Sequence, residues 1–430
     1  MSEVRVRFAP SPTGLLHLGA ARTALFDLLF ARYYDGDLIL RIEDTDRERS
    51  RPQFERAQVE DLEWLGLSFD EGPYRQSERG ELYEDAARRL TDAGLTYEST
   101  DESGRRALYF RPPVRSGSFV DELRGGVTFG GVEDFVILKS DDTPSYNFAV
   151  VVDDLELGVT HVIRGEEHLS NTARQALLYK ALGATWPRFI HLGVILGPDG
   201  KKLSKRHGVA SIADYRSGGY LPEALVNYLV LLGWNHPQGK EEFADLDEIS
   251  QEWDPSRLGS SPSTFDPDRL LFFNANHIRR LPVEDLRMRL EPYLEGPLPR
   301  GRELAAVEAI REDMRTLSEA PRLLRRITGP VDPSAFVEEL PDSSGEVFGY
   351  VAAGLEGREF GDVEEARNFV AGLRAWAKEN GIKTRDLLHP LRLALTGKNR
   401  GPEMAYLFAV LGAEEVRERI LWAREARLGS

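Results

Sequence analysis

The chain has 430 residues, no cysteine and a formal net charge of −16 at pH 7. This length predicts two to four domains, and the lack of cysteine excludes disulfides, thiolate nucleophiles and cysteine-ligated zinc or iron–sulfur sites. The acidic charge argues against a general nucleic-acid coat protein, and the sequence shows neither a bilayer-spanning apolar run nor a signal-peptide pattern, so we expect a cytoplasmic protein without a membrane segment.

The first part of the chain has the pattern of an α/β domain. Residues 4–8 alternate apolar side chains with arginine, which predicts a strand, and apolar residues at helical spacing predict a helix from Leu18 onward. A second strand is predicted at 38–42, followed by a helix that runs through Trp64. Residues 98–134 are rich in Gly, Arg, Asp and Ser, and we expect them to form an inserted subdomain.

The α/β pattern then resumes. We predict strands near residues 136–138, 148–152 and 159–163, a helix at about 170–182 and a strand at 190–196. From Pro222 onward, apolar residues recur mainly at helical spacing. The sequence therefore predicts a parallel α/β domain interrupted by an insert and followed by an all-helical half.

Residues 10–20 lie where the first predicted strand passes into the first helix. A helix N-terminus at this position offers free N–H groups and a positive dipole end to a phosphate. Gly19 permits a close approach to the backbone, and His17 can donate to a phosphate oxygen that gains charge in a transition state. A lone histidine and glycine would equally suit an ordinary strand–helix loop.

Residues 201–206 carry four cations directly after a Gly-Pro-Asp-Gly turn. This lysine loop suits either a solvated basic surface or a loop whose lysines neutralise a triphosphate as pyrophosphate leaves. The chain contains neither a Walker A motif nor a G-x-G-x-x-G fingerprint, so we do not expect nucleotide binding by those routes. Its histidines lack metal-ligand spacing, and no resident metal is expected.

Five motifs follow one another along the first half of the chain. They are A-P-S-P-T-G-x-x-H-x-G, R-I-E-D-T-D, Y-N-F-A-V-V-V-D-D, V-I-R-G-E-E-H and K-L-S-K-R. Together they resemble the motifs of the glutamyl-tRNA synthetases, a class I aminoacyl-tRNA synthetase family. The resemblance continues at residues 264–274 and 389–397 and so covers nearly the whole chain.

The resemblance implies an α/β fold in which a class I, Rossmann-like parallel sheet carries an acceptor-binding insert and precedes a helical anticodon-binding half. The implied segments are 1–97 and 135–215 for the catalytic domain, 98–134 for the short acceptor-stem insert, 216–300 for a helical stem-contact domain and 301–430 for the anticodon-binding domain.

The resemblance also implies a reaction. The family uses ATP to convert L-glutamate to glutamyl-adenylate, releases pyrophosphate, and transfers the glutamyl group to the 3′ end of tRNA(Glu). Magnesium is expected with the ATP. The sequence does not specify the oligomeric state, and a monomer is the working expectation.

Two groups of residues are implied to line the substrate sites. The residues implied for ATP and catalysis are Thr13, His17, Gly19, Glu167, Lys202 and Lys205. A glutamate site needs cations for two carboxylates and an anion for one ammonium. By the resemblance, Arg7 binds the side-chain carboxylate, Arg164 lies nearby, Glu43 holds the ammonium, and Tyr146 and Ser11 complete the pocket.

Two departures limit what the resemblance carries. The segment between Tyr97 and Val120 is short and lacks cysteine ligands, so we expect a compact, zinc-free insert. In the helical half, Arg322 is the candidate for an arginine that reads the third anticodon base and rejects tRNA(Gln), but it also suits a solvated helix position. Whether tRNA(Gln) is charged as well stays open.

Three alternative functions can be compared with the motifs. A truncated paralogue that glutamylates a modified base in aspartate tRNA lacks the anticodon-binding half, which this chain contains. Glutaminyl-tRNA synthetases carry P-E-P-N-G where this chain has Pro-Ser-Pro-Thr-Gly at 10–14. A non-catalytic tRNA-binding protein would be expected to lack Lys205, His17 or Arg7, and all three are present.

Overall fold

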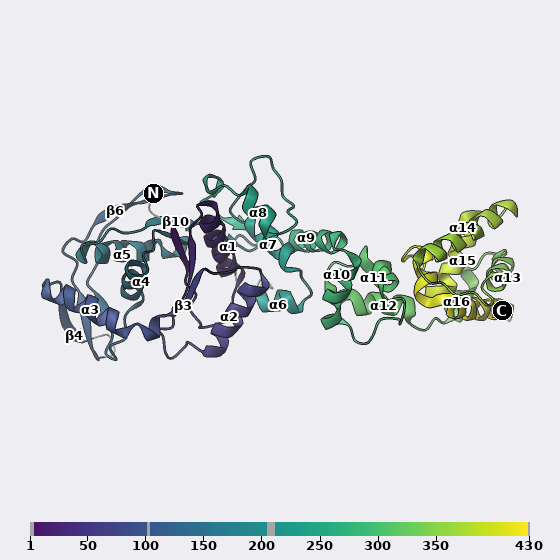
Figure 1. Cartoon of the computed structure of the whole chain (residues 1–430), viewed down its shortest axis with the longest axis horizontal. Coiled ribbons are helices and arrows are strands. Elements are labelled where there is room, and N and C mark those ends of the chain that lie inside the picture. The colour runs from purple at the N-terminus through teal and green to yellow at the C-terminus, as the bar shows by residue number, and fades with distance from the viewer. Residues whose placement is uncertain (1–3, 101–103, 204–210, 429–430) are drawn as a thin grey trace. The chain divides into compact units, whose positions relative to one another are not determined.

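The computed structural model describes residues 4–100, 104–203 and 211–428, which divide into two compact units (Figure 1). The first unit comprises Met1–Ser217 and Pro222–Phe273. The second comprises Gly218–Leu221 and Asn274–Ser430. Within the described ranges, no helix combines the length and apolar character that a membrane span requires.

Parallel strands form the centre of the first unit. Strands β1 (Arg5–Phe8), β2 (Asp37–Ile42) and β3 (Glu71–Arg75) pair in that order, all in parallel. Beside β1 lies β9 (His161–Gly165), where the Thr160 amide just before it donates to the Arg5 carbonyl at 2.9 Å. Strand β9 pairs in parallel with β10, Arg188–Leu192. The predicted strands at 4–8, 38–42 and 159–163 are confirmed.

Helices pack on this sheet, and the apolar side chains that face the strands are buried. The helices are α1 (Leu18–Tyr33), α2 (Pro52–Trp64), α3 (Gly80–Asp92), α4 (Tyr146–Glu156) and α5 (Leu169–Ala181). Three of these helices, α1, α2 and α5, confirm the helices predicted after Leu18, through Trp64 and over 170–182.

The prediction of a strand at 148–152 was wrong, because these residues lie inside α4. The run Phe-Ala-Val-Val-Val is rich in β-branched residues, and all five side chains are buried. A fully apolar run of this length has no periodicity that separates a buried strand from a buried helix. The correction matters because the helix carries Asp153 and Asp154 into the same buried region.

Residues 98–134, together with the strands on either side of them, form two antiparallel β units, and the strand predicted near 136–138 belongs to one of these units. Strands β4 (Thr96–Thr100), β5 (Arg106–Phe110) and β8 (Phe135–Leu138) form one of them. The other is the hairpin of β6 (Gly117–Asp121) and β7 (Gly125–Phe129). Strand β6 also pairs in parallel with β10, with Asp121 opposite Phe189, so the insert extends the sheet of the catalytic unit.

The chain after β10 begins with a break that the sequence did not reveal. The predicted strand at 190–196 is divided into β10 and β11 (Ile195–Leu196) at Gly193. A Cβ atom at Gly193 would lie 2.3 Å from the Ser261 carbonyl oxygen, so only glycine fits there. Strand β11 pairs with β12 (Ser263–Thr264).

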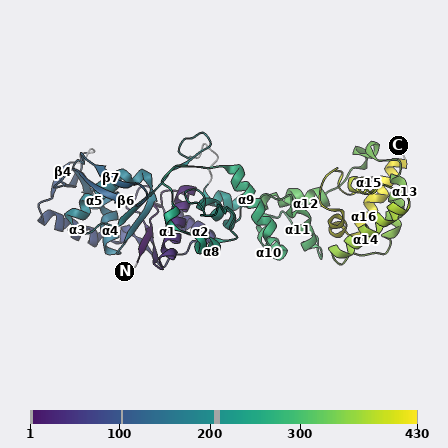
Figure 2. The ribbon, with the colours of Figure 1, turned by 90° about the horizontal axis from the view of Figure 1, so that it is seen from above.

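The remainder is helical, as predicted from Pro222 onward. The first unit contains α6 (Ile212–Ser217), α7 (Pro222–Val230) and α8 (Leu246–Glu252), and the chain passes to the second unit within α9, Pro267–Arg280. The second unit contains α10 (Val283–Leu290), α11 (Glu303–Arg311), α12 (Ala320–Thr328), α13 (Ser344–Gly354), α14 (Val363–Glu379), α15 (Thr384–Thr396) and α16 (Met404–Leu428). Figure 2 shows α13, α14 and α15 beside α16.

Candidate active site

A cavity of about 1020 Å³ opens at the carboxyl ends of the parallel strands of the first unit. This is the edge of an open α/β sheet at which ligands usually bind. The structure brings ten of the twelve sequence-predicted site residues into its lining: Arg7, Ser11, Thr13, His17, Gly19, Glu43, Tyr146, Arg164, Glu167 and Lys202. Lys205 lies outside the described residues, and Arg322 belongs to the second unit.

Adjacent parallel strands explain why residues far apart in sequence meet here. Arg7 lies near the end of β1, Glu43 directly follows β2, and Arg164 lies near the end of β9. Gln58 of α2 holds the loop between β1 and α1. Its Nε2 donates to the Ser11 carbonyl at 3.1 Å and to the Gly14 carbonyl at 2.7 Å. This support fixes the loop over the cavity.

His17 is the N-cap of α1, and its Nδ1 accepts from the Ala20 amide at 3.2 Å. The side chain is open to solvent at the cavity mouth but desolvated on its protein side, and this desolvation lowers its pKa, with Lys202 acting in the same direction and Glu167 opposing. Since Nδ1 accepts a hydrogen bond, the neutral ring carries its proton on Nε2. His17 is therefore a neutral N–H donor beside the helix terminus.

Glu167 and Lys202 form an ion pair across the cavity, with 3.5 Å between Lys202 Nζ and Glu167 Oε1. Burial acts to raise the pKa of Glu167, but its own backbone amide and Lys202 hold it below the ordinary value. The carboxylate folds back over Gly165, where a Cβ atom would lie only 2.1 Å from Glu167 Oε2. The first lysine of the predicted loop motif is thus within reach of the cavity.

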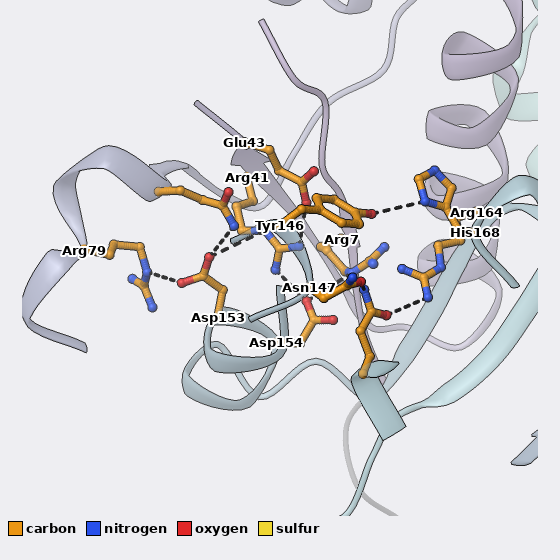
Figure 3. A network of polar contacts seen from close by, with 12 residues as sticks. Arg7, Arg41, Glu43, Arg79, Tyr146, Asn147, Asp153, Asp154, Arg164 and His168 are labelled. Atoms are coloured by element: carbon orange, nitrogen blue, oxygen red, sulfur yellow. Dashed lines mark hydrogen bonds and ion pairs between the residues drawn. The ribbon is translucent and has the colours of Figure 1, made fainter. Parts of the chain in front are cut away.

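Arg7 and Glu43 belong to a buried ionic network that centres on Arg41 (Figure 3). Arg41 Nη1 donates to Asp154 Oδ1 at 2.5 Å, and its Nη2 donates to Glu43 Oε1 at 3.1 Å. The same Asp154 oxygen accepts from Arg7 Nε at 3.2 Å. Asp153 lies beside them and accepts from Arg79 Nε at 2.7 Å. The network fixes both Arg7 and Glu43 in place.

Arg41, Asp153 and Asp154 hold Arg7 and Glu43 in this network, and the sequence motifs did not single them out. They stand within two of the quoted motifs, R-I-E-D-T-D and Y-N-F-A-V-V-V-D-D. The signal was present, because a charged residue inside a buried apolar segment calls for a buried partner. The mistaken strand at 148–152 hid the fact that the two aspartates end a helix facing β1 and β2.

Arg164 differs from Arg7 and Arg41 in its surroundings. It is 5% exposed, and its Nη2 donates to Thr172 Oγ1 and to Gln175 Oε1, each at 2.7 Å. Among the described residues, no carboxylate lies within ion-pair distance of it, and its Nη1 has no hydrogen-bond partner. Burial lowers its pKa, but a guanidinium stays protonated. The cavity therefore holds a buried positive charge that no carboxylate of the described residues pairs with.

Tyr146 and His168 face each other on the same wall, with 3.2 Å between the Tyr146 hydroxyl and His168 Nδ1 (Figure 3). Burial lowers the pKa of His168 to about 4, and the neighbouring Arg164 contributes in the same direction. Burial likewise raises the pKa of Tyr146 to about 12. Both groups are neutral at pH 7, so they offer hydrogen bonds rather than charge to a ligand.

Asp27 on α1 was also missed. It lines the cavity, its side chain is fully buried, and neither carboxyl oxygen has a hydrogen-bond partner in the structure. Burial raises the pKa of Asp27 well above its ordinary value, although Arg7 opposes the shift. Helix α1 thus carries a buried carboxyl group whose uncharged form is favoured, on the same face as Gly19 and Thr23.

Comparison with known proteins places these features in a family. Residues 3–109 and 99–272 match the catalytic domain of the class I tRNA synthetases (E and Q), and residues 285–423 match an anticodon binding domain. Glutamate–tRNA ligase 1 of Rubrobacter xylanophilus is 64% identical over 99% of both chains. Glutamate–tRNA ligase 1 of Fervidobacterium nodosum is 39% identical, over 98% of this chain and 99% of its own.

A solved structure gives the same result. The glutamate tRNA ligase from Elizabethkingia meningosepticum, crystallised in complex with its amino acid, has a TM-score of 0.87 at 30% identity and covers 99% of both chains. Similarity of this extent includes the sheet, the insert and the helical half together. The chain therefore belongs to the glutamate–tRNA ligase family of class I aminoacyl-tRNA synthetases.

Proposed function

We propose that this protein attaches L-glutamate to the 3′ end of tRNA(Glu) in two steps that consume ATP. In the first, a glutamate α-carboxylate oxygen attacks the α-phosphorus of ATP, and pyrophosphate leaves. In the second, a hydroxyl of the terminal tRNA ribose attacks the carbonyl carbon of glutamyl-adenylate, and AMP leaves. Neither step needs a nucleophile from the protein, so the site acts by positioning and charge stabilisation. We place this reaction in the cytoplasm and expect a monomer.

The observation that carries the proposal is the pairing of two kinds of site in one cavity. At one end, His17 and Gly19 stand at a helix N-terminus beside Lys202, a combination suited to phosphates. At the other, Arg164 offers an uncompensated positive charge next to Arg7 and Glu43. A carboxylic acid and a nucleoside triphosphate that react with each other must be bound side by side in one cavity.

The glutamate end fits a dicarboxylic amino acid. Among the described residues, Arg7 uses Nε alone in a hydrogen bond, which leaves its two terminal nitrogens for the side-chain carboxylate, and Arg164 adds a second cation. Glu43 holds the ammonium, and its position is fixed by Arg41. Tyr146 and Ser11 complete the pocket. The neutral amide of glutamine would leave a buried guanidinium without its anion, which disfavours glutamine.

At the ATP end, His17 Nε2–H donates to an oxygen of the reacting phosphate, and Lys202 and Lys205 neutralise the departing pyrophosphate. Thr13 and Glu167 border the nucleotide. Mg²⁺ would lower the repulsion among the phosphates. The donor set fits a metal brought mainly by ATP, since Glu167 and Asp214 line the cavity but the described residues hold no cluster of three metal-ligating side chains.

The helical half is proposed to bind the anticodon, and Arg322 to read its third base. Arg322 lies on α12, its side chain is 51% exposed, and its Nη2 pairs with Glu319 at 3.0 Å. A pair this exposed is weak and can be replaced by a nucleobase. We expect Arg322→Gln to raise charging of tRNA(Gln) relative to tRNA(Glu), measured with both tRNAs. An unchanged ratio of the two would refute the role of Arg322.

The short insert, 98–134, is proposed to meet the acceptor stem without a metal. The other proposed segments are those expected from the sequence, namely 1–97 and 135–215 for catalysis, 216–300 for stem contact and 301–430 for the anticodon. Elemental analysis of the purified protein tests the metal-free insert. Stoichiometric zinc would contradict it.

The test of the first step is ATP–pyrophosphate exchange with glutamate, run with and without tRNA(Glu). We expect exchange that depends on glutamate and that glutamine does not support. Arg164→Gln is expected to raise the KM for glutamate while the KM for ATP stays close to that of the wild type. Absence of exchange under both conditions would favour a tRNA-binding protein without catalytic activity.

A further inference from the structure

The guanidinium of Arg164 is supported from the insert through a chain of buried hydrogen bonds. Asp121, the last residue of β6, accepts from the Nδ1–H of His191 at 2.6 Å. His191 Nε2 in turn lies 3.0 Å from Thr172 Oγ1 and accepts from Arg164 Nε at 3.4 Å. The Thr172 hydroxyl accepts from Arg164 Nη2 at 2.7 Å.

The carboxylate of Asp121 determines which tautomer His191 adopts. Burial lowers the pKa of His191, with Arg164 contributing, although the hydrogen bond to Asp121 opposes the shift, so the ring is neutral. A neutral ring has one N–H, and the carboxylate requires it on Nδ1. Nε2 is then an acceptor, as the guanidinium N–H requires. The Thr172 hydroxyl can donate either to this nitrogen or to the His168 carbonyl, which lies 3.2 Å away. The other tautomer would point an N–H at the N–H of Arg164.

We propose that Asp121 and His191 are positioning residues for Arg164, which hold its guanidinium in the orientation that receives the glutamate carboxylate. The inference rests on the proposed function of Arg164. The groups that bond to its guanidinium are neutral acceptors, which orient it without neutralising its charge. The carboxylate of Asp121 does not contact the guanidinium and acts on it through the ring of His191. The insert thereby becomes part of the amino-acid site as well as a proposed acceptor-stem contact.

Asp121→Asn tests this role, because asparagine keeps the size of the side chain. Its Oδ1 can still accept from the Leu123 and Arg124 amides, as Asp121 does at 3.1 and 3.0 Å. Its amide group, however, takes the place of Oδ2, which accepts from both Nδ1 and the main-chain amide of His191 at 2.6 and 3.0 Å. The amide donates to Nδ1 and forces the ring proton of His191 to Nε2, and the main-chain hydrogen bond is lost with it. We expect the KM for glutamate to rise about 10-fold or more, while the KM for ATP changes less than about 2-fold.

A matched control separates positioning from simple attachment of the insert. Glu122 is the next residue, and its Oε1 accepts from Arg188 of β10 at 2.8 Å, so it also links the insert to that strand but at the exposed side. We expect Glu122→Gln to leave both KM values unchanged. Equal effects of Asp121→Asn and Glu122→Gln on the KM for glutamate would overturn the proposal.

The experiment includes Arg164→Gln, so that two failures can be told apart. If Arg164→Gln leaves the KM for glutamate unchanged, the proposed role of Arg164 fails, and the inference fails with it. If Arg164→Gln raises this KM and Asp121→Asn does not, only the inference is overturned.

A measurement on the wild-type protein keeps the proposal testable if Asp121→Asn does not fold. Nitrogen-15 NMR of histidine-labelled protein reports which ring nitrogen carries the proton, and a His191→Gln variant assigns the signal. We expect His191 to be protonated on Nδ1 and to be an acceptor at Nε2. A proton on Nε2, or on both nitrogens, at pH 7 would overturn the inference.

Discussion

At the scale of single residues, the candidate site depends on charges and protons that neighbouring groups hold in one state. Asp154 pairs with Arg7 and Arg41, and a main-chain amide occupies Nδ1 of His17. Asp27 has no hydrogen-bond partner among the described residues, and burial raises its pKa and favours the neutral carboxyl group. These contacts determine which nitrogen or oxygen atoms can bind a ligand and which of them carry a proton. Each contact can be tested by replacing the side chain with one of similar shape.

His17→Asn separates the two roles of His17. Asparagine is a good N-cap, so the start of α1 stays intact, but the Nε2–H donor is lost. We expect kcat for adenylate formation to fall about 10²- to 10³-fold with stability within about 0.5 kcal/mol of the wild type. His17→Ala should show the same loss of rate plus a stability loss of about 1 kcal/mol. A rate unaffected by His17→Asn would remove His17 from catalysis.

Asp27→Asn tests the buried acid through the pH dependence of stability. The pKa of Asp27 is raised in the folded state, so its favourable contribution is complete below its unfolded pKa and is lost as pH rises toward the folded pKa. The variant should therefore gain on the wild type by up to about 1.4 kcal/mol per pH unit above roughly pH 4. Urea unfolding at pH 5, 6, 7 and 8 measures the difference, and a constant difference would show that Asp27 is ionised.

At the scale of elements, α4 anchors the site. Its N-terminal residue Tyr146 lines the cavity, and its C-terminal aspartates neutralise arginines of β1 and β2. The fold places a helix here because the sheet needs cover on that face, and tertiary burial outweighs the strand preference of the valines.

Asp154→Asn should therefore destabilise the whole first unit. The change removes a negative charge from between two buried cations, for which a loss of about 3–5 kcal/mol is typical. Urea unfolding monitored by tryptophan fluorescence measures it. The control is Asp85→Asn on α3, whose pair with Arg88 is exposed and should contribute less than about 0.5 kcal/mol. Similar losses in the two variants would mean that the buried network does not stabilise the fold.

The sequence predicted the three strands whose carboxyl ends carry Arg7, Glu43 and Arg164, because alternating or continuous apolar residues and turn residues mark them. It also predicted most cavity residues, since they stand in motifs whose order matches a family. It could not predict α4, because a buried apolar run has the same appearance in a helix and in a strand. Nor could it predict the link from Asp121 to His191, which depends on β6 pairing with β10 across a long sequence separation.

At the scale of the whole molecule, an acidic protein must bind an acidic polymer. The net charge is −16, so tRNA has to contact locally basic surfaces. On α12, the side chains of Arg322 and Arg325 are 51% and 61% exposed, and we propose that they belong to such a surface. Their pairs with acidic neighbours are exposed and weak, so they can exchange for phosphate contacts.

The affinity for tRNA should accordingly fall steeply with salt. Binding that releases counterions gives a linear decrease of log K with log salt concentration, with a slope near −0.9 for each phosphate contacted in duplex regions. Fluorescence titration of tRNA(Glu) at several KCl concentrations measures the slope, and Arg325→Gln should reduce its magnitude by about 1. A salt-independent affinity would exclude a phosphate-based interface.

The most direct test of the central claim is the charging reaction itself. Purified protein is incubated with ATP, tRNA(Glu) and radiolabelled glutamate, aspartate or glutamine, and the labelled tRNA is precipitated with acid. We expect glutamate alone to become attached, in an amount approaching one per tRNA, and Arg164→Gln to lose this preference or the reaction. Attachment of glutamine in place of glutamate, or no attachment of any of the three, would contradict the proposed function.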